Sequence, residues 1–197
     1  MPNTSRINGF RPVLTGNGSA WSGQMNRYFV PTADATAIGI GDLVKISGLA
    51  SVNGVRGVTK ASVGDAVVGA VVGVSFNPLN LNTPVFRAAN ANIIDGGQYV
   101  FVADDPNTVY EAQVAGALLA ADVGLNANHV DAGVSTTTGL SGQSVDGSTK
   151  AVTATLTLKV LDIVQREDNE SFSTLAKVRV KINNHQLAAG TGTLGIA

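Results

Sequence analysis

A glycine-rich hexapeptide near the end of the chain is the first candidate for chemistry. Residues 190–195 read Gly-Thr-Gly-Thr-Leu-Gly, which matches the Gly-x-Gly-x-x-Gly pattern that holds a dinucleotide pyrophosphate between a strand and the start of a helix. Only two residues follow Gly195 in the sequence, too few for that helix. We therefore interpret the hexapeptide as part of a glycine-rich tail and expect no cofactor.

Histidine and serine residues could supply metal ligands or a nucleophile. His129 and His185 stand in polar, turn-like surroundings, and neither has a second histidine three or four residues away to complete a metal-binding face. We expect both on the surface. Ser141 or Ser144 could act as a nucleophile beside His129, but neither lies in the strand-to-helix turn that exposes a catalytic serine. The sequence therefore predicts no catalytic residue, no metal site and no enzyme.

Acidic pairs and thiols offer no stronger candidate. Asp104 and Asp105 are adjacent, so their side chains point apart at the end of a strand, and the Pro-Asn that follows favours a turn. The chain has no cysteine, which excludes disulfide scaffolds, zinc ribbons and thiol nucleophiles.

The charge balance argues against two classes of partner. With 13 basic and 14 acidic residues, the chain has no overall field that would attract nucleic acid or anionic lipid. Its longest apolar run, residues 66–74, is far shorter than the roughly 20 residues of a membrane helix. Charged residues make up only 14%, which indicates either a surface partly covered by protein partners or an exposed surface rich in Thr and Ser.

Residues 1–33 differ from the rest of the chain and predict an extended N-terminal arm. The segment carries three arginines and no acidic residue, and Asn, Gly, Ser and Pro interrupt its apolar patches. Its aromatic residues either close the protein's own core or anchor in a groove of a partner, since Trp, Tyr and Arg dominate binding energy at interfaces. The candidate partner-binding residues are Arg6, Phe10, Arg11, Trp21, Arg27 and Tyr28.

Residues 34–183 predict a β-rich body. We expect one hairpin from 43–46 and 55–59, turned by Asn53-Gly54, and a second from 99–103 and 109–114, turned by 104–107. Between them, 66–74 predicts a buried strand that is bent or bulged. Residues 115–121 predict a short helix or a loop, and the Ser/Thr/Gly tract 135–150 predicts an exposed loop.

Two alternating patterns predict the last strands of the body. Residues 152–160 alternate apolar and polar side chains, and a bulge after Val160 would keep Asp162 out of the core. In 177–182 one face is apolar, and the other carries Lys177, Arg179 and Lys181, a possible intersubunit basic face. The acidic turn 167–170 is either solvated or paired with that face on a neighbour. We expect a mainly β fold with a single barrel-like or sandwich body, the arm, and a flexible C-terminal tail over 184–197.

Five strings of the sequence are together similar to one known family: residues 1–12, 28–31, 41–44, 102–106 and 180–186. The chain resembles the capsid decoration, or structural cement, proteins of tailed bacteriophages. The resemblance implies a small protein on the outer capsid surface of the virion that bridges subunits of the major capsid protein, often as a homotrimer. The alternatives are a host- or glycan-binding virion module such as a tail or fibre domain, and a soluble hydrolase.

Overall fold

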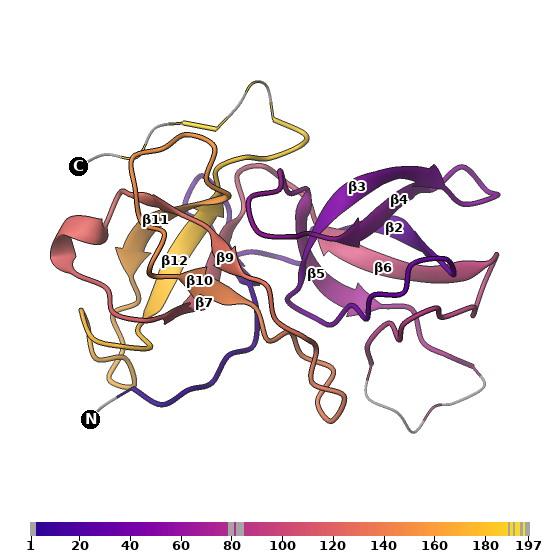
Figure 1. The fold of residues 1–197 in the computed structure, drawn as a ribbon, viewed down its shortest axis with the longest axis horizontal. Helices are drawn as coiled ribbons and strands as arrows, with labels where there is room; N and C mark the ends of the chain where they lie inside the picture. The colour runs from indigo at the N-terminus through magenta and orange to yellow at the C-terminus, as the bar shows by residue number, and fades with distance from the viewer. Residues whose placement is uncertain are drawn as a thin grey trace.

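The strands of the protein gather into two β units that lie side by side (Figure 1). The computed structural model describes residues 3–78, 81, 85–188, 190, 192, 193 and 195. Within these residues, one unit is a closed barrel of five strands and the other is a sheet of seven strands, here called the second sheet. The mainly β fold with a barrel is therefore confirmed, although the body is built from two β units.

The barrel closes in the order β2-β4-β3-β5-β6, with β6 pairing back onto β2. The predicted hairpin of β3 and β4 is confirmed, and Gly54 in its turn has φ 75°, a left-handed conformation that glycine adopts without strain. The predicted irregularity in β5 is also confirmed, because its register against β6 shifts between Val71 and Gly73. The strands are β2 (Asn26–Pro31), β3 (Leu43–Ala50), β4 (Arg56–Lys60), β5 (Gly69–Val74) and β6 (Gly97–Ala103).

The second sheet is centred on β7. This strand pairs antiparallel with β12 and with β1, and parallel with β10. Its path runs β8-β11-β12-β7-β10-β9. Because β8 and β9 are separated by Asn128 alone, one short segment borders both ends of that path. The strands are β1 (Arg11–Leu14), β7 (Val109–Ala115), β8 (Asn126–Ala127), β9 (His129–Val130), β10 (Ser144–Asp146), β11 (Leu158–Ile163) and β12 (Lys177–Ile182).

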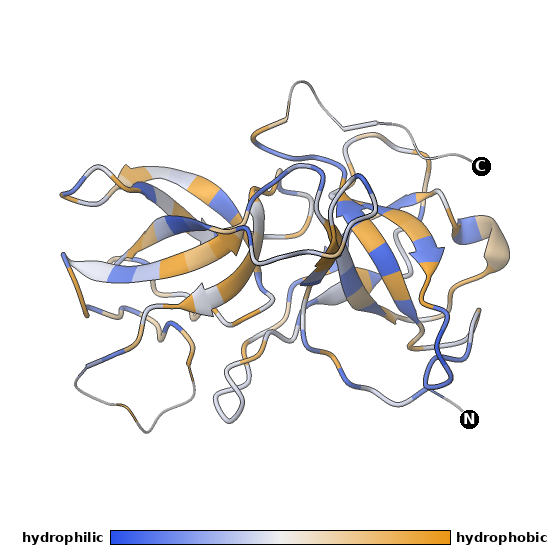
Figure 2. Cartoon of the chain, turned by 180° about the vertical axis from the view of Figure 1, so that it is seen from behind, coloured by the Kyte–Doolittle hydropathy of each residue, from blue (hydrophilic) through white to orange (hydrophobic). Residues whose placement is uncertain are grey.

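The patterns that predicted β11 and β12 are confirmed in part. β12 alternates half-buried basic and buried apolar residues, and bands of opposite hydropathy run along the strands of this unit (Figure 2). The register of β11 against β12 shifts between Val160 and Asp162, so the predicted bulge is present and Ile163 returns to the core. The strand predicted to begin at Val152 instead begins at Leu158, and Val152 is 46% exposed. Ala151 forms an isolated bridge with Asn126, and residues 152–157 lie mostly in turns and bends.

The second predicted hairpin is wrong. Residues 97–103 and 109–115 do form strands, but β6 belongs to the barrel and β7 to the second sheet. The predicted turn between them is present, and in it the Asn107 N–H donates to Asp105 Oδ1 at 2.8 Å. It carries the chain from one unit to the other. The Tyr110 hydroxyl then donates to Ala103 O at 2.7 Å and ties the two strand ends together.

Residues expected to be exposed also build the junction of the units. The tract 135–150 contains β10 and five buried residues, so its prediction as an exposed loop is wrong over that part. The segment 115–121 leads into a single 3₁₀ turn, η1 (Ala120–Asp122). No helix in the described part of the chain is long and apolar enough to cross a membrane. The buried residues of the tract are Gly139, Ser141, Gln143, Ser144 and Val145.

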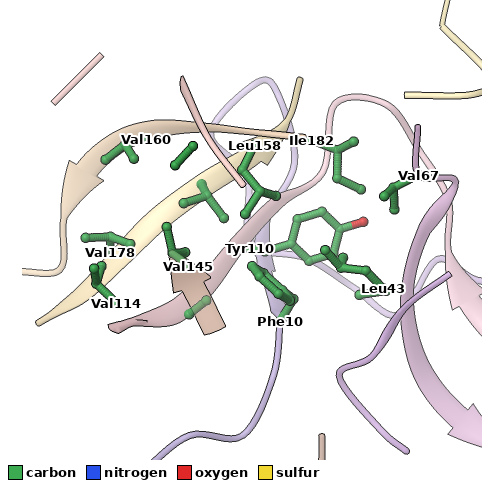
Figure 3. Packing of buried hydrophobic residues seen from close by; sticks show 14 of the residues in the cluster. Phe10, Leu43, Val67, Tyr110, Val114, Val145, Leu158, Val160, Val178 and Ile182 are labelled. Carbon is green, nitrogen blue, oxygen red and sulfur yellow. The ribbon is translucent and has the colours of Figure 1, made fainter. Parts of the chain in front are cut away.

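The buried apolar residues form two clusters. One lies inside the barrel and includes Val30, Val58 and Val100. The other fills the second sheet and continues across the junction, where Leu43 and Val67 of the barrel side face Tyr110 of β7 (Figure 3). We call this second cluster the junction core. Because this cluster contains residues of both units, the two units pack against each other through a common core rather than being joined only by a linker.

The two chain ends are not free segments where the structure describes them. Residues 11–14 and 26–31 are strands of the two units, so the expectation of an unpaired arm is wrong there. The apolar patches of 1–33 are too short to show strand periodicity, and their partners come from distant residues. In the predicted tail, His185 is 4% exposed and the Gln186 N–H donates to Val67 O at 2.9 Å. Positions 189, 191, 194, 196 and 197 of the tail lie outside the described residues.

Candidate functional site: the cleft between the two β units

A cleft of about 640 Å³ lies where the barrel meets the second sheet. We call it the interunit cleft. One wall comes from β5 and the turn before β3, and the other from β1, β7 and the start of β12. Its lining includes four of the six residues predicted to bind a partner, together with one residue of the predicted basic face. These are Arg6, Phe10, Arg11, Trp21 and Lys177.

Trp21 reaches the cleft because the chain folds back on β1. The backbone N–H of Trp21 donates to Val13 O at 3.0 Å, and Ala20 forms a β-bridge with Leu14. The half-buried indole packs against the junction core. Its Nε1 is buried and has no hydrogen-bond partner within the described residues. An unpaired buried donor of this kind is rare and costs about 1–3 kcal/mol.

Phe10 and Pro12 complete the apolar part of the lining. Phe10 is 1% exposed and belongs to the junction core, and Pro12 is buried in β1 opposite Tyr110. Gly9 allows this close approach, because a Cβ at that position would lie 2.4 Å from Gly41 O. For Phe10, burial fits the reading in which an aromatic residue of the first segment closes the protein's own core.

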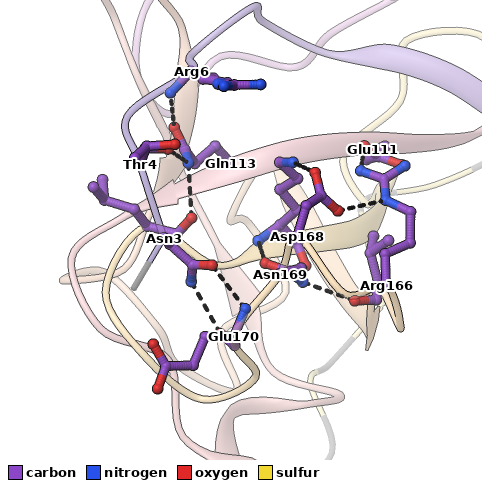
Figure 4. A network of polar contacts seen from close by, with 12 residues as sticks. Asn3, Thr4, Arg6, Glu111, Gln113, Arg166, Asp168, Asn169 and Glu170 are labelled. Carbon is purple, nitrogen blue, oxygen red and sulfur yellow. Dashed lines mark hydrogen bonds and ion pairs between the residues drawn. The ribbon is translucent and has the colours of Figure 1, made fainter. Parts of the chain in front are cut away.

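The polar rim of the cleft contains a shared set of ion pairs (Figure 4). Both carboxylate oxygens of Glu111 accept from Arg166, at 2.8 and 3.2 Å, whereas Arg11 reaches only one of them, at 3.5 Å. The bond to Glu111 raises the pKa of Arg166. Asp168 pairs with Arg166 at 3.1 Å and also with Lys177, and these cations lower the pKa of Asp168, the bond to Lys177 most of all.

The rim therefore holds more positive than negative charge. Four cationic side chains, Arg6, Arg11, Arg166 and Lys177, face two carboxylates, Glu111 and Asp168. The guanidinium of Arg6 has no hydrogen-bond or ion-pair partner within the described residues. The side chain of Arg11 is 66% exposed, and among the described residues its one polar contact is the 3.5 Å contact to Glu111. Two of the four cations are thus available to an anionic group from outside.

Side-chain amides fix the position of Arg6. Gln113 of β7 accepts from the Arg6 N–H at 2.9 Å and donates to Thr4 O at 2.9 Å. Asn3 forms a reciprocal pair with Glu170, donating to its carbonyl at 3.0 Å and accepting from its N–H at 2.7 Å (Figure 4). The first described residues are therefore extended but docked along the second sheet.

The other two predicted partner-binding residues, Arg27 and Tyr28, lie on the barrel and do not line the cleft. The Arg27 guanidinium stacks over the ring of Tyr99 at 4.7 Å. Tyr28 is 4% exposed and donates to Asp104 Oδ2 at 2.6 Å. Burial raises the pKa of Tyr28, with the neighbouring carboxylate adding to the effect. Burial again fits the reading in which Tyr28 closes the protein's own core.

The predicted basic face has partners inside the same chain. Lys177 pairs with Asp168, Arg179 lies 3.4 Å from Asp162, and Lys181 donates to Asn107 at 2.9 Å. Its role between subunits stays a prediction. The acidic turn supplies one of these partners, so part of it is engaged by its own chain rather than only solvated.

A buried polar network at the junction was not predicted. Asp42 has no exposed surface, and it accepts from the Ser141 hydroxyl at 2.5 Å and from the Gly39 N–H at 2.7 Å. Lys60 lies 3.6 Å from Asp42 and 3.5 Å from Asp131. Burial raises the pKa of Asp42, and its contacts with Ser141, Gly39 and Lys60 oppose the rise. Ser141 thus holds a loop of the second sheet onto the barrel. The polar composition of residues 135–150 does not indicate this contact.

Both histidines are buried, so their prediction as surface residues is wrong. His129 has no exposed surface and lies 3.3 Å from Ala61 O, while Nδ1 of His185 accepts from the Leu187 N–H at 3.0 Å. Burial lowers the pKa of both residues. The elements that cover them are distant in sequence, and no local pattern indicates such burial.

Arg87 is a further buried polar residue that sequence reasoning missed. Its guanidinium has no exposed surface and donates to Thr36 O at 2.6 Å and to Pro31 O at 2.8 Å. Asp34 lies 3.9 Å away, and burial lowers the pKa of Arg87. These contacts fasten the segment before β6 to the barrel. Within the described residues no three His, Asp or Glu side chains form a group that could hold a metal ion.

Comparison with known proteins identifies no relative of this chain. No family model, no curated protein and no solved structure matches it.

Proposed function

We propose that this protein is a structural binding protein that decorates the outer surface of a phage capsid and bridges subunits of the major capsid protein. The observation that carries the proposal is the interunit cleft, where one tryptophan and two underpaired arginines share a surface built on two β units. Aromatic residues and arginine dominate binding energy in protein interfaces. The resemblance to decoration proteins supplies the identity of the partner.

The architecture supports a role that depends on a rigid surface. Trp21 packs against the junction core, and Arg11 lies on β1, a strand paired with β7, so the backbone that carries both residues is in place before a partner arrives. A preformed site loses less conformational entropy on binding than a flexible arm does. Self-association as a trimer would add avidity, because several weak contacts made at once can strengthen binding by about 10²–10⁴.

Binding to undecorated capsids tests the proposed function. Full-length protein is incubated with expanded phage heads that lack decoration, and the fraction that sediments with the heads is measured. We expect saturable binding and a rise in the temperature at which the heads disrupt, because a ligand that binds only the intact shell stabilises it. Absence of binding to heads from the protein's own phage would contradict the proposal.

The same full-length protein can also be used to distinguish capsid binding from the alternative, a glycan-binding virion module. A glycan array probed with the full-length protein should show no saturable signal if the protein is a capsid component. A reproducible glycan signal that is lost in Trp21→Ala, together with no binding to heads, would favour the alternative, because sugar rings stack on aromatic side chains and Trp21 lines the cleft.

A further inference from the structure

We infer that the interunit cleft receives an acidic, extended segment of the partner protein, with carboxylates on Arg6 and Arg11 and an apolar residue against Trp21. The inference rests on the proposed function and deepens it by naming the chemistry of the bound segment. It follows from the charges, contacts and shape of the cleft.

The surplus of positive charge selects an anionic partner. The chain as a whole has a net charge of −1, yet the rim holds four cations and two carboxylates. A local surplus of positive charge on a chain whose net charge is negative attracts acidic groups to this surface and repels basic ones. An acidic segment would bring the rim toward neutrality.

The contacts show which cations are available. Glu111 is fully engaged, since each of its oxygens accepts from Arg166, and its side chain is only 13% exposed. Arg11 is left with a 3.5 Å contact to an oxygen that already has a closer donor. A partner carboxylate can therefore take Arg11 without breaking the Arg166 pair. Arg6 offers the second site, because Gln113 holds its backbone while its guanidinium has no hydrogen-bond or ion-pair partner in the described part of the chain.

The shape and apolar lining favour an extended peptide chain. The cleft is lined by residues from β1, β5, β7 and β12, and its volume of about 640 Å³ fits a few residues rather than a folded domain. Trp21, Val72 and Leu140 provide half-buried apolar surface beside the charged rim. A segment that alternates acidic and apolar side chains matches both parts of the lining.

Titration with a defined peptide tests the inference. The probe is a short peptide, blocked at both ends, in which Asp and Glu alternate with Val and Leu, and its comparison peptide carries Asn and Gln in place of the acids. Trp21 is the single tryptophan of the chain, so its fluorescence reports occupancy of the cleft directly, and calorimetry measures affinity independently. We expect the acidic peptide to bind and to shift the Trp21 emission, and the amide peptide to bind about tenfold more weakly or not at all.

Matched charge variants locate the binding. The double variant Arg6→Glu/Arg11→Glu should weaken peptide binding by about tenfold or more, and Arg6→Gln/Arg11→Gln should weaken it by a smaller factor. Arg27→Glu is the control, since Arg27 is also an exposed arginine of the first segment but lies on the barrel over Tyr99. It should bind as the native protein does. Far-ultraviolet circular dichroism confirms that each variant is folded.

The outcomes distinguish this inference from the proposed function. If the native protein decorates heads and both cleft double variants decorate them equally well, the inference is overturned and the proposed function stands. If the acidic peptide binds in the cleft but no head is decorated, the proposed function falls and the cleft chemistry stands. Equal binding of the acidic and amide peptides, or a loss of binding in Arg27→Glu as large as in the double variant, also overturns the inference.

Discussion

At the scale of single residues, the charges of the site could be predicted from sequence, whereas burial could not. Arg6, Arg11 and Trp21 were identified because their types dominate interfaces, and the structure brings all three to one cleft. Arg166 and Glu111 were missed, because their pairing depends on strands that meet only in the folded chain. The buried histidines were missed for the same reason.

The buried histidines predict a loss of stability in mild acid. Burial lowers the folded-state pKa of His129 and His185 below the ordinary value of 6.5. The unfolded chain therefore binds more protons, so the stability that these residues contribute is present above pH 6.5 and is lost as the pH falls through their folded-state pKa values. His129 is faced by Asp131, Asp65 and Lys60, whose charges modify the shift without reversing it.

Thermal unfolding measured from pH 8 to pH 5 checks this prediction. The midpoint temperature should decrease as the pH is lowered, by about 2–4 °C for each kcal/mol of unfolding free energy that is lost. The double variant His129→Gln/His185→Gln, first compared with the native protein at pH 8, should lose less over the same range. Burial raises the pKa of Asp42, which acts with the opposite sign, so the difference between the two proteins is the informative quantity. An unchanged pH dependence in the variant would show that these histidines are not responsible.

At the scale of elements, local patterns predicted strands and irregularities but not partners. The β3–β4 hairpin, the irregularity in β5 and the bulge in β11 follow from turn residues and side-chain alternation close to them. The pairing of β6 and β7 was predicted wrongly, since two strands joined by a tight turn usually pair. Here each strand finds its partners elsewhere, β6 in β2 and β5, β7 in β12 and β1.

The close approach of β5 to β6 gives a prediction with an internal control. A Cβ on Gly69 would lie 2.1 Å from Ala103 O, a backbone atom that cannot move freely, whereas a Cβ on Gly73 would meet the Phe101 side chain at an ordinary 3.5 Å. Gly69→Ala should lower the free energy of unfolding by about 1–3 kcal/mol, because the strands must separate. Gly73→Ala, in the same strand, should change it by less than about 1 kcal/mol. Urea unfolding measures both, and equal effects would contradict the close approach.

At the scale of the whole molecule, the junction core makes two β units into one folding unit. Phe10 of the first segment, Leu43 and Val67 of the barrel side and Tyr110 of the second sheet share this core (Figure 3). Composition and alternation predicted a mainly β body, but the division into a barrel and a second sheet depends on pairings between residues more than fifty positions apart. Such long-range pairings leave no local signal.

Phe10→Ala tests the shared core. Phe10 is 1% exposed, so its truncation should lower the free energy of unfolding by about 3–5 kcal/mol. Because both units depend on this core, Trp21 fluorescence and far-ultraviolet circular dichroism should show one coincident transition, shifted together in the variant. Phe76→Ala is the control, since Phe76 is 68% exposed and its loss should cost about 0.5 kcal/mol or less. Two separate transitions in the native protein would contradict a shared core.

The most direct test of the account as a whole is an electron-microscopy map of phage heads decorated with the full-length protein. We predict that a segment of the capsid subunit fills the interunit cleft between β1 and β5, with its density against Trp21 and next to Arg6 and Arg11. A map in which the protein is attached through the far end of the barrel while the cleft stays open to solvent would contradict the central claim.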